Sequence, residues 1–202
     1  MELKPRLQGT VSDRRLTART RSTADAAYSG CGELVTSFDY PPLTTLHRVW
    51  SWEKFTVANP SLERMAHHEA GHVVLLEWMG LVSPRAVATA EAGLTYLPEN
   101  STPPAAPSDP TGELTAMAAA MFHAGLMAEL LHAGAPWHGP IHRLQDDHLR
   151  AEALLSEVFG AHSTGAHAFA QRVALHVLAS RWVRVQEVAA QLVATGVWVP
   201  AS

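Results

Sequence analysis

The sequence predicts a mainly α-helical domain with one small β element. Three segments indicate this fold class: an apolar helical stripe around residues 62–79, a long apolar run at 114–134, and a short β-prone region at 84–100. Hydrophobic residues make up 47% of the 202 residues and charged residues 17%, so the chain can bury a sizeable core.

The first predicted helix begins at Asn59-Pro60-Ser61, where a capping side chain precedes a proline in the first turn. It runs to about Met79, and Gly80 ends it. Six residues of this segment then share one face at spacings of three and four: Met65, His68, His72, Leu75, Leu76 and Met79.

Three further helices are expected, at 111–133, 142–159 and 164–195, the last of them broken once. Two β-prone pieces flank Glu91-Ala92-Gly93 and predict a hairpin. We expect residues 1–58 to form an N-terminal tail and a partly ordered extension, and residues 59–199 to form the folded domain.

Bulk properties exclude several classes of protein. A net charge of −4 and a pI of about 6.3 give no electrostatic reason to expect nucleic-acid binding. Cys31 is the only cysteine, which excludes an intramolecular disulfide. The start of the chain lacks the apolar region of a secretory signal, and the run 114–134 contains His123, Glu129 and His132. We therefore expect a buried helix rather than a membrane span, and a cytoplasmic protein.

The segment His68-Glu69-Ala70-Gly71-His72 is an H-E-x-x-H pattern. On a helix, His68 and His72 lie one turn apart on the same face, so both imidazoles can reach one zinc ion at about 2.0–2.1 Å. Glu69 is then placed to take a proton from the attacking water and pass it to a leaving amine. His67 points about 100° away from His68, and Gly71 leaves room for another element to approach closely.

A catalytic zinc usually has three protein ligands, so a third must come from further along the chain. Asp147 lies on the predicted apolar face of its helix, where a carboxylate is costly unless it is paired or bound to metal. Its neighbour Asp146 falls on the solvent side and is the alternative ligand or a residue that orients one. Glu129 also falls on a buried stripe, either as a ligand or as a residue that orients a histidine. Three histidines are weaker candidates: His123, His142 and His148.

Four segments in order resemble FtsH-type zinc metallopeptidases, over roughly residues 64–197. HHEAGHVV resembles their H-E-A-G-H-A segment, and AVATAEAGLTYLPE resembles their short strand pair. ELTAMAAAMFHAGLMAELL is similar to their helix with G-R-A-A-E-E-L, and QDDHLRAEAL to their N-D-L-x-x-A-T helix. The resemblance implies a helical zincin-like peptidase domain with a small hairpin or edge-strand element.

Carried over by motif, the resemblance implies that His68, His72 and Asp147 bind zinc and that Glu69 is the base. Glu129 matches the first glutamate of the A-E-E stretch. The sequence departs from the family pattern at Leu126, which replaces an arginine, and at His148, which replaces a leucine. It also contains no G-x-x-x-x-G-K-[ST] motif, so an AAA ATPase module is not expected.

Together these observations predict an ATP-independent zinc metalloendopeptidase with one Zn²⁺ per chain, acting on flexible or unfolded polypeptides. A strand carrying Ala88 and Ala90, or Leu94 and Tyr96, could pair with an extended substrate. The alternative is a non-catalytic zinc-binding module that regulates or binds another protein. A homo-oligomer or a separate partner protein is compatible with either prediction.

Overall fold

The computed structural model describes residues 41–56, 60–81, 83, 85–97, 109–143, 145–160 and 163–201. The predicted fold class is confirmed, since these residues are mainly helical with a small antiparallel sheet. The helices are η1 (Leu43–His47), α2 (Leu62–Trp78), α3 (Glu113–His132), α4 (Asp146–Phe159), α5 (Thr164–Ser180) and α6 (Trp182–Thr195). The strands are β1 (Ala86–Ala88), β2 (Gly93–Thr95) and β3 (Val197–Trp198).

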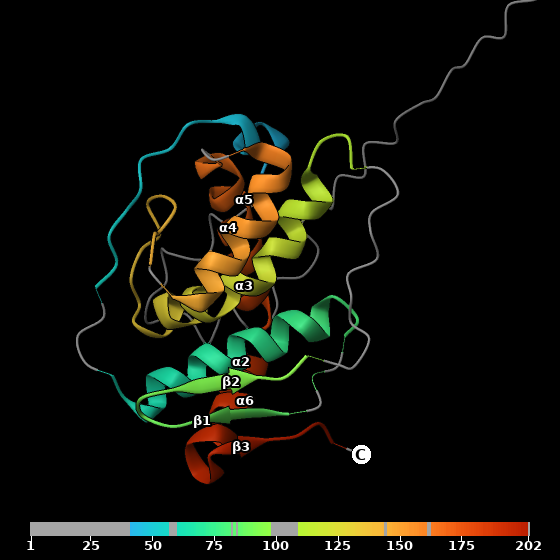
Figure 1. The fold of residues 1–202 in the computed structure, drawn as a ribbon. Coiled ribbons are helices and arrows are strands. Elements are labelled where there is room, and N and C mark those ends of the chain that lie inside the picture. The colour runs from blue at the N-terminus through green and yellow to red at the C-terminus, as the bar shows by residue number, and fades with distance from the viewer. Residues whose placement is uncertain are drawn as a thin grey trace, which may run out of the picture.

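Helix α2 crosses the middle of the molecule, between the sheet on one side and α3, α4 and α5 on the other (Figure 1). Ser61 caps its start by accepting a hydrogen bond from the Arg64 backbone N–H at 3.2 Å. The predicted cap Asn59 lies outside the described residues. The helix ends at Trp78, and Gly80 follows with a φ of 78°, a conformation that favours glycine.

Gly71 allows α2 and α3 to pack closely, as its place in the sequence predicts. A Cβ atom at this position would lie 2.6 Å from the Ala124 carbonyl oxygen and 2.7 Å from the Ala128 Cβ. Helix α3 is long and apolar enough to cross a membrane by length and composition, but 67% of its most apolar window is buried inside the structure. It therefore packs as a core helix.

The sheet has the order β2-β1-β3, and all its neighbouring strands are antiparallel. The predicted hairpin corresponds to β1 and β2, with Ala88 opposite Gly93. Strand β3, whose Trp198 pairs with Ala86, was not predicted. Because β3 pairs with β1, the central strand is β1, and β2 keeps one edge without a sheet neighbour in the described part of the chain.

Helix α4 begins later than expected, at Asp146 rather than residue 142. Just before the helix, the backbone of Ile141 is hydrogen-bonded to the side chain of Gln171 instead of to a helical turn. Its N–H donates to Gln171 Oε1 at 2.8 Å, and its carbonyl accepts from Gln171 Nε2 at 2.8 Å. The predicted apolar face of this helix is buried at Ala151 and Leu155, whereas Val158 is exposed.

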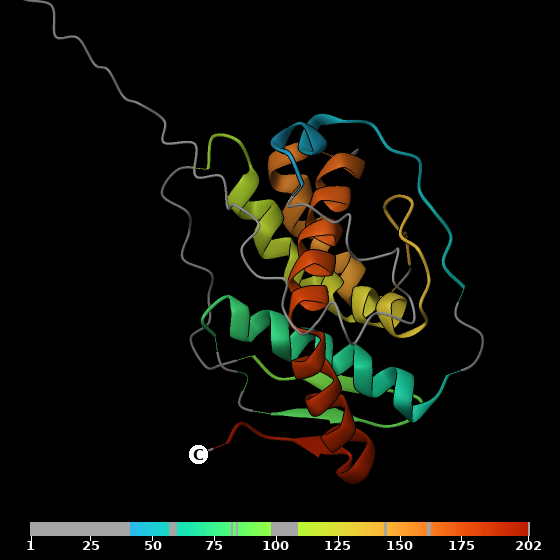
Figure 2. The same cartoon turned by 180° about the vertical axis from the view of Figure 1, so that it is seen from behind.

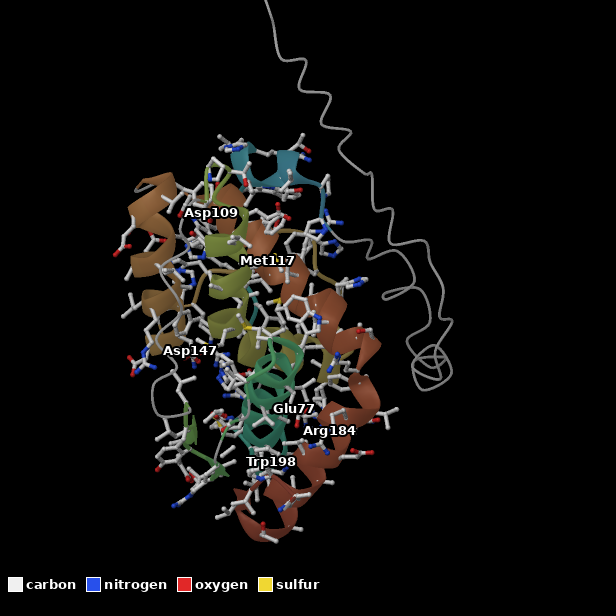
Figure 3. The ribbon with its side chains drawn as sticks, turned by 90° about the vertical axis from the view of Figure 1, so that its right-hand side faces the viewer. Glu77, Asp109, Met117, Asp147, Arg184 and Trp198 are labelled. Carbon is white, nitrogen blue, oxygen red and sulfur yellow. The ribbon has the colours of Figure 1, made fainter. Side chains whose placement is uncertain are left out.

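The C-terminal helix is broken once, as expected, into α5 and α6, which follow one another almost end to end (Figure 2). The break is at Arg181, whose ψ of 24° leaves the helical range. Helix α6 is tied to α2 by Arg184, which donates from Nε and Nη2 to the Glu77 carboxylate at 3.2 and 2.8 Å (Figure 3).

The described part of the predicted extension packs on the helices. Leu46 of η1 is buried in the main core, and Glu53 forms a parallel bridge with Ile141. Residues 1–40, 57 and 58 of the predicted tail and extension lie outside the described residues. The ordered segment 41–56 therefore covers the α3–α5 end of the molecule.

Candidate metal centre

Helix α2 brings three of the predicted site residues together. His68, Glu69 and His72 are all buried in its middle turns. The helical spacing of four residues turns both imidazoles to one side, with their Nε2 atoms 3.2 Å apart. The helix itself therefore presents a pair of nitrogen ligands.

Asp147 completes this group from the first turn of α4 (Figure 3). Its Oδ2 lies 3.3 Å from His68 Nε2 and 3.2 Å from His72 Nε2. The three ligand atoms all lie within 4.8 Å of one another, an arrangement that can hold a metal ion. The chain thus offers two imidazoles from one helix and a carboxylate that follows them by 79 and 75 positions.

Hydrogen bonds fix which nitrogen of each imidazole faces this group. His68 Nδ1 lies 2.7 Å from Glu129 Oε1, and His72 Nδ1 lies 2.9 Å from the Met121 carbonyl oxygen. Both oxygens are acceptors, so both Nδ1 atoms carry hydrogen and donate. In the neutral ring the Nε2 lone pairs then point at each other and at the Asp147 carboxylate, and only a cation or a proton can stabilise that arrangement.

The pKa values follow from the same contacts. Burial lowers the pKa of His68, but hydrogen bonds to Asp147 and Glu129 outweigh it and raise the pKa to about 9. Burial raises the pKa of Asp147, but hydrogen bonds from His68 and His72 bring it far below its usual range. The pKa of Glu129 is lowered because the His68 hydrogen bond, aided by Arg143, exceeds the cost of burial. A positive charge is therefore strongly favoured between these carboxylates.

Glu129 lies behind His68 rather than beside the ligand atoms. It is almost fully buried and accepts a hydrogen bond from Arg143 Nη1 at 3.0 Å, while Arg64 Nε lies 3.3 Å from the same oxygen. Its contact with His68 Nδ1 makes it an orienting residue of the kind common behind metal-binding histidines. Of the two functions that the sequence left open for Glu129, the geometry matches the second.

Glu69 is held at the side of the histidine pair by strand β2. Its Oε2 accepts a hydrogen bond from Thr95 Oγ1 at 2.7 Å, while its Oε1 has no such partner among the described residues. Gly93 makes room for this side chain, since a Cβ there would lie 2.7 Å from Glu69 Cδ. One carboxylate oxygen is therefore fixed and the other is available.

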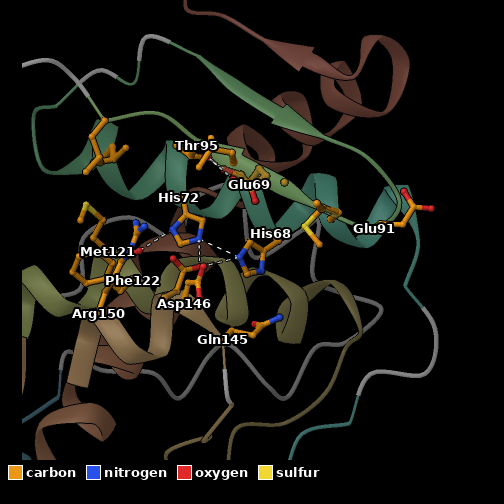
Figure 4. Close-up of a pocket in the computed structure, with 17 residues that line it drawn as sticks. His68, Glu69, His72, Glu91, Thr95, Met121, Phe122, Gln145, Asp146 and Arg150 are labelled. Carbon is orange, nitrogen blue, oxygen red and sulfur yellow. Dashed lines mark hydrogen bonds and ion pairs between the residues drawn. The ribbon is translucent and has the colours of Figure 1, made fainter. Parts of the chain in front are cut away.

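These side chains line one cleft of about 390 Å³ (Figure 4). Its lining contains His68, Glu69, His72 and Asp147. Asp146 also lines the cleft, but it is exposed and does not belong to the group of converging ligand atoms. The structure thus separates the two neighbouring aspartates as the helical stripe predicts.

The predicted substrate strand needs a correction. Ala88 belongs to β1, which pairs with β2 on one side and β3 on the other, so its backbone has no free edge. Ala90 lies in the bend between β1 and β2. Leu94 lies in β2 and Tyr96 directly after it, on the strand that borders the cleft, and both are exposed. The prediction for Ala88 and Ala90 is therefore wrong, because the unforeseen strand β3 places β1 in the centre of the sheet.

Other histidines lie outside the ligand group of His68, His72 and Asp147. His67 lies outside the ligand group: its ring stacks on His132 at 3.8 Å and its Nδ1 contacts the Glu63 carbonyl oxygen at 2.8 Å. His123 and His148 are buried and form a second converging group with His167, which was not among the predicted site residues. The apolar turns around His123 and His167 indicate that these two residues are buried, but the polar turn around His148 does not link it to them.

Comparisons of the chain with protein-family models, with curated proteins and with solved structures give no match. The resemblance to FtsH-type peptidases therefore stays a prediction. What the structure adds is the convergence of His68, His72 and Asp147 as a group that can hold a metal ion.

Proposed function

We propose that this chain is a zinc-dependent endopeptidase that cleaves flexible or unfolded polypeptides. The observation that carries the proposal is a three-ligand group, His68, His72 and Asp147, that shares its cleft with the carboxylate of Glu69. Three protein ligands leave one coordination position open, which is the arrangement of catalytic zinc rather than structural zinc.

The donor set favours zinc. Two imidazole nitrogens and one carboxylate oxygen suit a borderline ion, whereas magnesium and calcium prefer oxygen ligands alone. The Nδ1 hydrogen bonds of His68 and His72 hold both Nε2 atoms ready, so little reorganisation is needed on binding. When bound, zinc would act as a Lewis acid toward the scissile carbonyl and lower the pKa of water in the open position.

Glu69 supplies the proton transfer. With Oε2 held by Thr95, Oε1 can accept a proton from the attacking water and later donate it to the leaving amine. Burial of Glu69 beside a positively charged centre keeps the carboxylate oriented for this transfer. These two functions of one side chain correspond to the general base and the general acid of peptide hydrolysis.

Strand β2 supports the choice of an extended substrate. Its free edge borders the cleft, so a peptide in β conformation can add to the sheet through backbone hydrogen bonds. Only a segment without stable structure of its own can bind in this way. Apolar side chains that line the cleft, Leu94, Leu97 and Phe122, favour apolar substrate residues.

The test is the substitution Glu69→Gln in the full chain, with casein and an internally quenched peptide as substrates. We expect zinc content to be unchanged and the cleavage rate to fall by at least about 100-fold, because the proton acceptor is lost. Glu157→Gln is the matched control, because this exposed glutamate of α4 lies outside the cleft. Cleavage that is unchanged in Glu69→Gln would refute the peptidase and leave a non-catalytic zinc-binding module.

A further inference from the structure

A second group of histidines lies between three helices. His123 comes from α3, His148 from α4 and His167 from α5. One ring nitrogen from each residue lies within 4.8 Å of the other two. The three side chains are 1%, 5% and 0% exposed, so solvent does not account for their polar atoms.

Hydrogen bonds account for both nitrogen atoms of His167, since His123 Nε2 can donate to Nδ1 when no metal is bound, but they leave a nitrogen of His148 without a partner among the described residues. His167 Nε2 lies 2.6 Å from Glu152 Oε2, and because a carboxylate accepts, Nε2 carries the hydrogen. The other nitrogen, Nδ1, then presents a lone pair to His123 Nε2 at 2.9 Å. His148 Nδ1 is buried and has no hydrogen-bond partner among the described residues.

The histidine pKa values in this group are lowered, whereas the pKa of His68 in the first group is raised. Burial, together with the neighbouring imidazoles, lowers the pKa of His123 well below its usual range and that of His148 to about 4. Burial also lowers the pKa of His167, despite the hydrogen bond to Glu152. Neutral imidazole is the form that binds metals.

Trp52 and Glu152 pack around the three histidines. The ring of Trp52 meets the rings of His148 and His167 edge-on, with centroids 5.6 and 5.2 Å apart. Glu152 orients His167 in the way that carboxylates orient metal-binding histidines. The imidazoles are buried beneath an aromatic ring, and one of them is oriented by a carboxylate. These features are typical of a structural metal site rather than a catalytic one.

We propose that His123, His148 and His167 bind a second divalent transition-metal ion, of the zinc class, that ties α3, α4 and α5 together. Three imidazoles favour this class over magnesium or calcium. The ion would also act on the first site, since His148 follows Asp147 directly on α4. Holding His148 fixes the helix turn that presents the third ligand of the first site.

Metal counting on the full chain tests this inference. The protein is stripped with a strong chelator, reloaded with Zn²⁺, dialysed against a weak chelator and analysed for zinc per chain. We expect two ions in the wild type, one in His68→Gln/His72→Gln and one in His123→Gln/His167→Gln. The control His138→Gln, an exposed histidine outside both groups, should keep two.

The outcomes separate this inference from the proposed function. One ion in the wild type, lost in His68→Gln/His72→Gln, would overturn the second site and show that its histidines only bond to one another. One ion that is lost in His123→Gln/His167→Gln instead would support the second site and contradict the first. Two ions retained in His123→Gln/His167→Gln would also overturn it.

A spectroscopic measurement covers the case in which the buried double variant does not fold. Co²⁺ is added to His68→Gln/His72→Gln, which leaves the second group intact. We expect one equivalent of Co²⁺ to bind, with the visible absorption of a nitrogen-rich site of low coordination number. Absence of this absorption in a protein with the circular dichroism of the wild type would refute the second site.

Discussion

His68 shows how the surroundings of a single residue prepare it to bind a metal ion. Its Nδ1 donates to Glu129, and its Nε2 faces His72 and Asp147. Without a metal ion, the two carboxylates favour a proton on His68, which is why its pKa rises to about 9 despite burial. Proton and metal ion therefore compete for the same nitrogen.

This competition predicts a pH dependence of zinc binding. Because a bound ion must displace one proton from His68, affinity should rise roughly tenfold per pH unit between about pH 6.5 and 8.5. Competition with a chromophoric chelator at three pH values measures it. In Glu129→Gln, which lacks one of the carboxylates that raise the pKa of His68, the rise should occur at lower pH. Affinity that does not change over this range would contradict the prediction.

The metal-free protein should show the opposite trend. The pKa of His68 is about 9 when folded and 6.5 at its ordinary value, so protonation stabilises the fold fully below pH 6.5. That stabilisation is lost as the pH rises through 9. The difference in melting temperature between zinc-loaded and metal-free protein should therefore widen from pH 6.5 to 9, which thermal unfolding monitored by circular dichroism would show.

At the scale of elements, the site depends on strand β2 lying close against helix α2. Thr95 holds Glu69, and Gly93 gives its side chain room. Neither residue is a metal ligand, so β2 positions the base while α2 and α4 supply the ligands. A substitution in β2 can therefore disturb the position of the base without removing a metal ligand.

The substitution Gly93→Ala tests this separation. The added Cβ would lie 2.7 Å from Glu69 Cδ, so the carboxylate must move while His68, His72 and Asp147 stay. We expect unchanged zinc content and a peptide-cleavage rate lowered about tenfold or more. Gly139→Ala is the control, because its Cβ would meet only the Glu53 side chain and the Ser51 carbonyl, at 3.2 Å or more. Loss of zinc together with activity would contradict the division of functions.

The elements also show what the sequence can predict. Helical spacing pairs His68 with His72 on the buried face of α2. On α4 the same spacing separates the half-buried Asp147 from the exposed Asp146. The later start of α4 was not predictable, since it depends on Gln171, a residue distant in sequence, binding the Ile141 backbone. One break in the C-terminal helix was expected, but its position at Arg181 was not, because no glycine or proline marks it.

Contacts between residues far apart in the sequence account for the other differences between the predictions and the structure. Strand β3 has two residues, too few for a periodic pattern, and its pairing with β1 decides which strand can meet a substrate. His167 could not be grouped with His123 and His148 from spacing, because the three lie on different helices. Local patterns thus predicted the ligands on one helix, whereas groupings across helices required the fold.

At the scale of the whole molecule, the ligands join segments that the chain keeps far apart. His72 and Asp147 are 75 residues apart, and Glu129 of α3 supports the group between them. A metal ion that binds only the folded chain stabilises it in proportion to its affinity. The stability of the domain should therefore depend on metal.

Removal of metal measures this dependence. With free zinc at 100 times its dissociation constant, each site should add about 2.7 kcal/mol to the free energy of unfolding, and a strong chelator should remove it. Urea unfolding with and without chelator gives the difference. In His68→Gln/His72→Gln the part due to the first site should disappear. Equal stability with and without chelator in the wild type would contradict metal binding at both groups.

The central claim is that His68, His72 and Asp147 hold one metal ion with an open position toward Glu69. The most direct measurement is anomalous diffraction at the zinc edge from crystals of the zinc-loaded full chain. We predict a peak bound by Nε2 of His68, Nε2 of His72 and a carboxylate oxygen of Asp147, with no fourth protein ligand. A peak whose third ligand is Asp146 or Glu129, a fourth protein ligand, or no peak between the two histidines would contradict the claim.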